Sequence, residues 1–220
     1  MEHLSMTDKA QTPAQDLGPE HYSSAIYDDR QRWAAYWYQL QAVRRSRAAN
    51  VLEIGVGSGT LSLYLRNQLR LRVTTFDCDQ RTGADVVGDV RDIRSYFGVD
   101  SFDAVLAFQV LEHIPYDDAV GVLQQIATIT RRHAIISLPH CGRSLQIRVE
   151  LGKTIPEAFI SRKVTTHRIW EYDGLHYWEI GARQYSLARV IKDVGRYFDI
   201  KRRYFCPDFA YHYFFECEKR

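Results

Sequence analysis

The sequence predicts an α/β fold in which a mostly parallel sheet carries helices on both faces. Three observations indicate this fold. Short apolar runs alternate with helical patterns between residues 50 and 139. Glycines directly follow the first of these runs, and acidic residues end the next two. Alternating strands and helices form βαβ units, and such units build parallel sheets that bind ligands at the carboxyl ends of the strands.

Length and composition fit one domain with a single core. The chain has 220 residues, of which 45% are hydrophobic. The net charge of +2 is too small to indicate a nucleic-acid or membrane partner. The four cysteines show no metal-ligand spacing, the N-terminus lacks the apolar centre of a secretory signal, and no apolar run is long enough for a membrane span. We therefore expect a cytoplasmic protein with reduced thiols.

The predicted elements follow in order along the chain. Residues 1–20 are expected to be a flexible segment before a single domain at 21–220. A helix is predicted from about 28 to 47, with Trp33, Tyr36, Trp37 and Leu40 on one apolar face. Further helices are predicted at 60–69, at 117–131 and near 187–194, where Gly195 ends the last one. The strands are predicted at 51–57, 72–79, 85–89, 102–111, 133–139, 197–205 and 211–218.

The stretch at about 141–184 shows weak periodicity and contains Trp170, His176, Tyr177 and Trp178. A connection of this length has a purpose beyond joining two elements. We expect it to be an insertion that covers the substrate at the carboxyl edge of the sheet, where open α/β sheets bind ligands.

The strongest motif is the run Glu53-Ile54-Gly55-Val56-Gly57-Ser58-Gly59, between the first strand and its helix. Glycines allow a sharp turn and close approach to a ligand, and the following helix N-terminus attracts a carboxylate or a phosphate. The spacing G-x-G-x-G differs from the dinucleotide pattern G-x-G-x-x-G. The acid at Glu53 would repel a pyrophosphate, so the motif favours a ligand with an ammonium group.

Acidic residues and one polar segment mark the ends of the next strands. Asp77 ends the second strand and can accept hydrogen bonds from ribose hydroxyls. Asp89 ends the third and can accept one from an adenine amino group. The fourth strand runs into Phe108-Gln109-Val110-Leu111-Glu112-His113-Ile114-Pro115 at the same edge. The ordered combination predicts a cofactor cleft.

Four segments resemble, in order, the signature segments of class I S-adenosylmethionine-dependent methyltransferases: VLEIGVGSGTLSLYL, TTFDCD, VVGDV and FDAVLAFQVLEHIP. They look most similar to the methyltransferase type 11 group of small-molecule enzymes. The resemblance covers residues 50–139 well and extends loosely through HYWEIG to the final YHYFFECE. It implies a Rossmann-like sheet of seven strands whose last strand is antiparallel, and it implies S-adenosylmethionine as the cofactor.

The resemblance also implies roles for residues. The glycines would wrap the methionine part of the cofactor, Asp77 would hold the ribose, Asp89 the adenine amino group, and Gln109 would lie near the methyl group. Asp79 is the alternative acid for the ribose. The expected cofactor-binding set is Glu53, Gly55, Gly57, Gly59, Asp77, Cys78, Asp89, Val90 and Gln109.

Catalysis would consist mainly of aligning an acceptor with the methyl group. A general base helps when the acceptor is a hydroxyl, and His113, His140 and His176 are the candidates. No acidic cluster indicates a Mg²⁺ site, so no metal is expected. FQVLEH replaces the Asn/Asp-Pro-Pro-Tyr/Phe segment of DNA amine methyltransferases, which argues against a nucleic-acid acceptor.

We therefore expect O-methylation of a small aromatic, sugar or lipid-linked molecule. N- or C-methylation, a non-catalytic binding protein, an NAD(P)-dependent oxidoreductase and aminopropyl transfer are the alternatives.

Overall fold

The main sheet of the computed structural model has the seven predicted strands, and the last of them is antiparallel as predicted. The structure describes residues 29–149, 158–164 and 168–220, so the segment expected to be flexible, 1–20, lies outside it. Seven strands run in the order β3-β2-β1-β4-β5-β9-β8. Among the described strands of this sheet, β9 alone runs in the direction opposite to the other six. The strands are β1 (Asn50–Ile54), β2 (Arg72–Asp77), β3 (Val86–Val87), β4 (Phe102–Phe108), β5 (Thr130–Pro139), β8 (Phe198–Phe205) and β9 (His212–Lys219).

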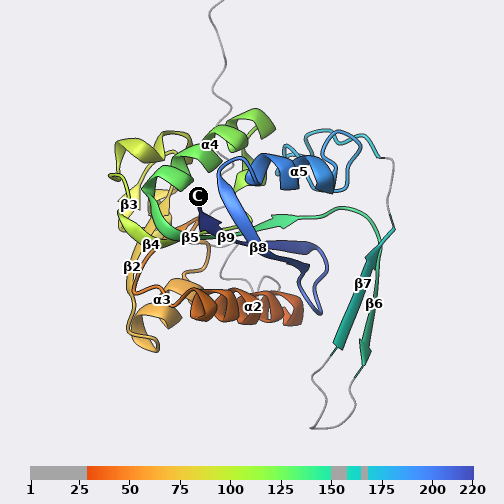
Figure 1. Ribbon diagram of the computed structural model, residues 1–220, viewed down its shortest axis with the longest axis horizontal. Coiled ribbons are helices and arrows are strands. Elements are labelled where there is room, and N and C mark those ends of the chain that lie inside the picture. Colours follow the sequence, from red (N-terminus) through yellow and green to blue (C-terminus); the bar gives the residue numbers. More distant parts are fainter. Residues whose placement is uncertain (1–28, 150–157, 165–167) are drawn as a thin grey trace, which may run out of the picture.

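Helices cover both faces of the sheet, as Figure 1 shows. On one face lie α2 (Arg30–Ser46) and α3 (Thr60–Asn67), and on the other α4 (Tyr116–Ile129) and α5 (Leu187–Val194). Short 3₁₀ helices η1 (Gln80–Thr82), η2 (Val90–Ser95) and η3 (Leu111–His113) follow β2, β3 and β4. The central strands are buried on both faces because both helix layers pack on them, with Leu52 and Val105 facing one layer and Val51 and Leu106 the other. None of the described helices combines the length and the apolar character that crossing a membrane requires.

The apolar face predicted for α2 is wrong in part. Leu40 is buried, but Trp33 and Trp37 are 55% and 54% exposed. The buried stripe of α2 consists of Ala35, Gln39, Leu40, Ala42 and Val43. Small side chains let the helix approach β4 and β5 closely, so the large indole rings are turned away from the sheet.

The predicted insertion contains a structure that its weak periodicity did not indicate. Strands β6 (Ser144–Val149) and β7 (Ala158–Lys163) form a separate two-stranded antiparallel sheet. In Figure 1 this ribbon extends away from the main sheet. The chain then returns to the sheet, where His140 and Ile180 form an isolated parallel bridge. The described part from residue 168 onward is therefore placed beside the carboxyl edge, where Lys163 at the end of β7 also donates a hydrogen bond to the carbonyl of His140.

Hydrogen bonds from two neighbouring residues help to fix this returning segment, residues 168–186, against η3. The backbone N–H of Tyr177 donates to the carbonyl of Glu112 at 2.8 Å. The indole Nε1 of Trp178 lies 3.1 Å from the carbonyl oxygens of both Leu111 and Ile114. Trp178 itself is 2% exposed. The segment therefore has a defined position over the end of β4.

Candidate active site

The residues predicted to form the site gather at one edge of the sheet. Because β1 to β5 are parallel, their carboxyl ends meet there. The residues that follow these five ends include, in strand order, Gly55, Cys78, Asp89, Gln109 and His140. Asp77 is itself the last residue of β2. The structure thus brings the predicted segments together, although they are spread over almost ninety residues of sequence.

The glycine loop needs its glycines for two different reasons. Gly55, Gly57 and Gly59 have φ angles of 77°, 55° and 73°, which side-chain-bearing residues rarely adopt. At Gly55 space is also missing, because an added Cβ would lie 2.4 Å from Cγ2 of Val110. At Gly59 an added Cβ would meet only ordinary contacts, the nearest at 3.9 Å. The close packing of Gly55 against Val110 joins the glycine loop to the end of β4.

Replacing Gly55 with alanine should therefore cost more stability than the same change at Gly83. Both residues have positive φ, 77° and 69°, but nothing lies within 4 Å of an added Cβ at Gly83. Both variants should lose about 1–2 kcal/mol from the left-handed backbone, and Gly55→Ala about 1–3 kcal/mol more from the overlap. Urea unfolding followed by circular dichroism measures both. Equal losses would show that the contact with Val110 relaxes without cost.

Glu53 is a buried carboxylate whose partners are incomplete. It is 4% exposed, and its Oε2 has no hydrogen-bond partner. Burial raises the pKa of Glu53 to about 8, against the opposing influence of Ser62 and Arg66. An ammonium group placed beside it would satisfy the unpartnered oxygen and favour the ionised form. Glu53 thus fits the amino-acid part of the expected cofactor.

Asp77 and Asp79 are engaged in different ways. The carboxylate of Asp77 accepts hydrogen bonds from the backbone N–H of Val56 at 2.8 Å and of Asp79 at 2.9 Å. It therefore holds the glycine loop to the end of β2 and keeps lone pairs for further donors. Asp79 instead caps η1 and pairs with Arg81, which keeps the pKa of Asp79 low. This difference favours Asp77 as the acid facing a ligand.

The third strand end is organised by an exposed ion pair. Asp89 caps η2 through the backbone N–H of Arg91 at 2.8 Å and pairs with the guanidinium of the same residue. The hydrogen bond from Arg91 holds the pKa of Asp89 below its usual value. Val90 is buried beside Asp89. At the end of β2, burial of the Cys78 thiol is the main cause that raises its pKa, and the negative charge of Asp77 raises it further. The thiol is therefore not a thiolate nucleophile at neutral pH.

Gln109 occupies an unusual backbone conformation. Its φ is 56°, in the left-handed region that non-glycine residues rarely adopt. Two hydrogen bonds to Ser137 of β5 hold it, from the backbone N–H at 3.0 Å and from Nε2 at 3.2 Å. Strained residues of this kind occur often at functional sites. The turn directs the chain from β4 into η3, which carries Glu112 and His113.

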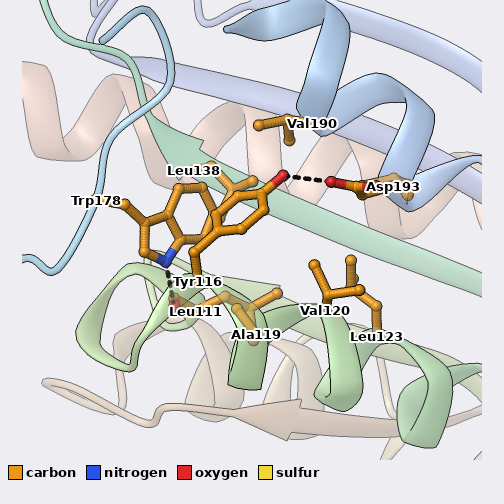
Figure 2. Close-up of a pocket in the computed structure, with 10 residues that line it drawn as sticks. Leu111, Tyr116, Ala119, Val120, Leu123, Leu138, Trp178, Val190 and Asp193 are labelled. Carbon is orange, nitrogen blue, oxygen red and sulfur yellow. Dashed lines mark hydrogen bonds between the residues drawn. The ribbon is translucent and has the colours of Figure 1, made fainter. Parts of the chain in front are cut away.

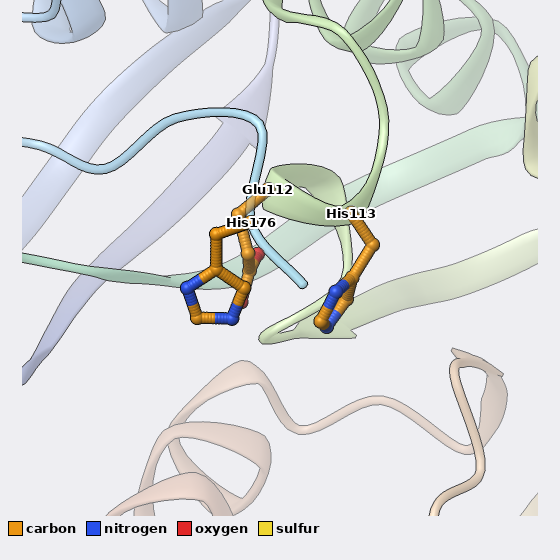
Figure 3. Close-up of side chains that lie close together, drawn as sticks. All are labelled: Glu112, His113 and His176. Carbon is orange, nitrogen blue, oxygen red and sulfur yellow. The ribbon is translucent and has the colours of Figure 1, made fainter. Parts of the chain in front are cut away.

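Two of the three candidate bases lie together. The rings of His113 and His176 are 5.0 Å apart between centroids, and Glu112 lies beside them (Figure 3). Burial lowers the pKa of His113 and raises that of Glu112 to about 8. Burial alone would also lower the pKa of His176, but the hydrogen bond to Glu179 and the negative charges of the surrounding carboxylates together outweigh burial and raise this pKa. His113 is therefore a neutral imidazole at pH 7.

His140 is placed in other surroundings. Its Nδ1 lies 2.9 Å from the carbonyl oxygen of Cys141, and its ring packs against Phe205 and Tyr213. Gly181 leaves the room for this ring, because an added Cβ would lie 2.5 Å from its Cε1. His140 thus contributes to the packing of the returning segment, and its role as a base stays a prediction.

A small hollow lies between α4 and α5, shown in Figure 2. Its lining is mainly apolar and includes Leu111, Leu138, Trp178 and Val190. At its rim Tyr116 donates a hydrogen bond to Asp193 at 2.7 Å. No residue of the glycine loop lines it, so it is distinct from the predicted cofactor site.

Sequence reasoning missed four side chains of this region. Tyr36 of α2 lies within 3.0 Å of Ser58 in the glycine loop, between the two hydroxyl oxygens. Glu112, Glu179 and Tyr211 surround the histidine pair. The sequence placed Glu112 beside His113, and Glu179 follows His176 by three residues, so both acids stood next to predicted histidines. Nothing in the sequence pointed to a site role for Tyr36 or Tyr211, which come from the two ends of the described chain.

Comparison with known proteins identifies the class. Residues 24–197 match the model of a family described as a methyltransferase domain. The chain therefore belongs to this family, and with its fold and strand-end motifs it is a class I S-adenosylmethionine-dependent methyltransferase. This confirms the resemblance predicted from the sequence and sets the oxidoreductase alternative aside. A comparison with curated proteins finds no match.

Solved structures share this fold at low sequence identity. The PH0226 protein of Pyrococcus horikoshii OT3 is 14% identical with a TM-score of 0.59, over 93% of this chain and 97% of that one. The 1,6-didemethyltoxoflavin-N1-methyltransferase of Burkholderia thailandensis, bound to 1,6-didemethyltoxoflavin and S-adenosylhomocysteine, is 19% identical with a TM-score of 0.57, over 90% and 83%. Magnesium protoporphyrin IX methyltransferase of Synechocystis PCC 6803 with bound SAM is 15% identical with a TM-score of 0.52, over 89% and 82%.

Proposed function

We propose that this methyltransferase transfers the methyl group of S-adenosylmethionine to a hydroxyl oxygen of a small aromatic, sugar or lipid-linked molecule. The observation that carries the proposal is the pair of His113 and His176 beside the end of β4. A hydroxyl becomes a strong nucleophile only when it loses its proton, whereas a neutral amine attacks without this step. Groups that promote ionisation are therefore most useful for an oxygen acceptor.

In this proposal the cofactor binds along the carboxyl ends of β1 to β4. When bound, the cofactor supplies a methyl group on a sulfonium, and the C–S bond breaks with its electron pair staying on sulfur. Gly55, Gly57 and Gly59 surround its amino-acid part, with Glu53 facing the ammonium group. Asp77 accepts from the ribose hydroxyls and Asp89 from the adenine amino group. The remaining residues that line it are Cys78, Val90 and Gln109.

The acceptor site of the proposal lies between η3 and the returning segment. The near-neutral net charge of +2 supports a small molecule rather than a nucleic acid. All four cysteines are free thiols, which supports a cytoplasmic location. N-methylation is the second candidate, because the similar enzyme of Burkholderia thailandensis is named as an N1-methyltransferase.

Calorimetry and an acceptor screen test the proposal in sequence. S-adenosylhomocysteine should bind at one site with micromolar affinity, and NADH should not bind. Matched pairs of acceptors, such as phenols and the corresponding anilines, are then offered with S-adenosylmethionine. Methylated phenols with unreacted anilines are expected. Methylation of the anilines alone would overturn the oxygen acceptor, and NADH binding without S-adenosylhomocysteine binding would overturn the cofactor.

Cofactor binding should release a proton from Glu53. With a pKa of about 8, this carboxyl is about 90% protonated at pH 7, and the cofactor's ammonium group would favour its ionised form. The heat of S-adenosylhomocysteine binding at pH 7 should therefore differ between phosphate and Tris by the heat of transferring up to about one proton to the buffer. Glu53→Gln should remove the difference. Equal heats in both buffers with the unaltered chain would show that Glu53 does not face the ammonium group.

A further inference from the structure

Glu112, His113 and His176 form a cluster with the composition of a metal site. One ligand atom from each lies within 4.8 Å of the other two. Figure 3 shows the side chain of Glu112 next to His176, with the ring of His113 opposite. Ligand atoms held about 2.1 Å from one ion lie about 3 Å apart, so small side-chain rotations would close the cluster. Two imidazoles and one carboxylate are a common ligand set for divalent transition metals.

The second ring nitrogen of each histidine is already held by an acceptor. Nδ1 of His113 lies 3.1 Å from the carbonyl oxygen of Leu175, and Nδ1 of His176 lies 2.8 Å from Oε1 of Glu179. Tyr211 donates its hydroxyl to the same oxygen of Glu179. When Nδ1 donates its proton in this way, the lone pair is on Nε2. Metal-binding histidines are held by carbonyls and carboxylates in this manner.

Glu112 supplies the independent observation that points to a ligand. Its side chain is 0% exposed, and both carboxylate oxygens lack a hydrogen-bond partner. A buried carboxyl group without partners is costly unless another group compensates for it. Its backbone carbonyl is engaged, since it accepts from Tyr177 at 2.8 Å. A cation between Glu112 and the two imidazoles would satisfy the carboxylate oxygens.

We propose that Glu112, His113 and His176 bind one divalent transition-metal ion, of which Zn²⁺ and Mn²⁺ are the candidates. Binding of the ion stands on the cluster alone. A catalytic role of the ion rests on the proposed function. An open coordination position of the ion would take the acceptor hydroxyl and lower the pKa of that hydroxyl, as metal ions do for bound water. The hydroxyl proton then passes to solvent, the oxygen–methyl bond forms, and the carbon–sulfur bond breaks with its electrons on sulfur.

A second set of three, Asp173, His176 and Glu179, also brings its ligand atoms within 4.8 Å of one another. Its carboxylates are already engaged. Oδ1 of Asp173 accepts from the backbone N–H groups of Leu175 at 2.9 Å and His176 at 2.7 Å. Oε1 of Glu179 accepts from Tyr211 and lies beside His176. The ion is therefore assigned to the set whose carboxylate has no partner, that of Glu112.

Metal binding by the full-length chain tests the assignment. After treatment with a chelator and dialysis, the protein is titrated with Zn²⁺ and with Mn²⁺ by calorimetry, and elemental analysis after dialysis gives the stoichiometry. We expect one ion per chain. Glu112→Gln and His176→Gln should each weaken binding more than about 10-fold, because even the loss of an outer-shell partner weakens metal binding 10–100-fold. Glutamine resembles the protonated carboxyl that burial favours, so Glu112→Gln should keep the fold, which circular dichroism checks.

Two matched variants serve as controls. Asp173→Asn retains an oxygen that accepts the same backbone hydrogen bonds, and His133→Gln removes a histidine on β5 that belongs to neither set. Both should bind the ion as the unaltered chain does. No binding of either ion overturns the inference, as does loss in Asp173→Asn with retention in Glu112→Gln. S-adenosylhomocysteine binding, measured on the same samples, tests the proposed function separately.

Discussion

Asp77→Ala is expected to weaken the binding of S-adenosylhomocysteine by about 1.5–3 kcal/mol, the range for hydrogen bonds to a charged group. This corresponds to a dissociation constant about 10- to 150-fold higher. The reason is the position of Asp77 at the last residue of β2, beside the glycine loop. Two lost contacts add to the effect. The carboxylate would no longer hold the backbone N–H groups of Val56 and Asp79 at 2.8 and 2.9 Å.

Asp79→Ala is the matched control for this prediction. Asp79 pairs with the exposed Arg81 and caps a single turn of 3₁₀ helix, so its loss should change cofactor affinity little. Calorimetry at one pH and salt concentration compares the two variants, and urea unfolding reports any loss of stability. If Asp79→Ala binds poorly and Asp77→Ala binds normally, the ribose acid is Asp79 and the loop contact of Asp77 is structural.

The sheet could be predicted because each of its central strands is marked by a pattern within a few consecutive residues. Each central strand is a short apolar run, and the residues that end these runs, such as Gly55, Asp77 and Asp89, are types that favour turns. Strands joined by βαβ connections run parallel, so all these ends lie at one edge of the sheet. The cofactor half of the candidate site therefore followed from the order of the motifs, without any knowledge of long-range contacts.

The acceptor half could not be predicted in the same way. His176 reaches Glu112 because Tyr177 and Trp178 bind the backbone of η3, contacts between residues more than sixty positions apart. No periodicity records such contacts, and the sequence offered His113 and His176 only as separate candidates. The absence of an acidic cluster led to an expectation of no metal, yet the proposed ligands are two histidines and a single acid.

The prediction of the buried face of α2 was wrong in part for a related reason. Helical spacing identifies a stripe but not which stripe packs on the sheet. Hydrophobicity predicted that Trp33 and Trp37 would be buried, whereas in the structure the small side chains of Ala35 and Ala42 are buried because the helix lies close to the sheet. The outcome depends on the shape of the sheet surface, which the helix sequence does not contain.

Trp178→Ala should destabilise the folded protein by about 3–5 kcal/mol, the range for removing a large aromatic ring from a core. The ring is 2% exposed and packs edge-on against Tyr116, with ring centroids 4.9 Å apart, at the hollow of Figure 2. Its removal leaves a cavity and takes the indole donor from the carbonyls of Leu111 and Ile114. Urea unfolding measures the loss, with Trp37→Ala on the exposed face of α2 as the control, for which a change of less than about 0.5 kcal/mol is expected.

Trp178→Phe separates packing from the hydrogen bonds. Phenylalanine fills most of the space, so the stability loss should fall to about 1–3 kcal/mol, the cost of unpaired buried groups. The returning segment would keep the hydrogen bond from Tyr177 to Glu112 but lose those of the indole, so the position of His176 relative to Glu112 and His113 would be held less firmly. Methyl transfer should then slow while the affinity for S-adenosylhomocysteine stays the same, because the glycine loop and Asp77 are untouched. A parallel loss of cofactor affinity would show that the two halves of the site are coupled, and that the segment supports the cofactor cleft as well as the acceptor side.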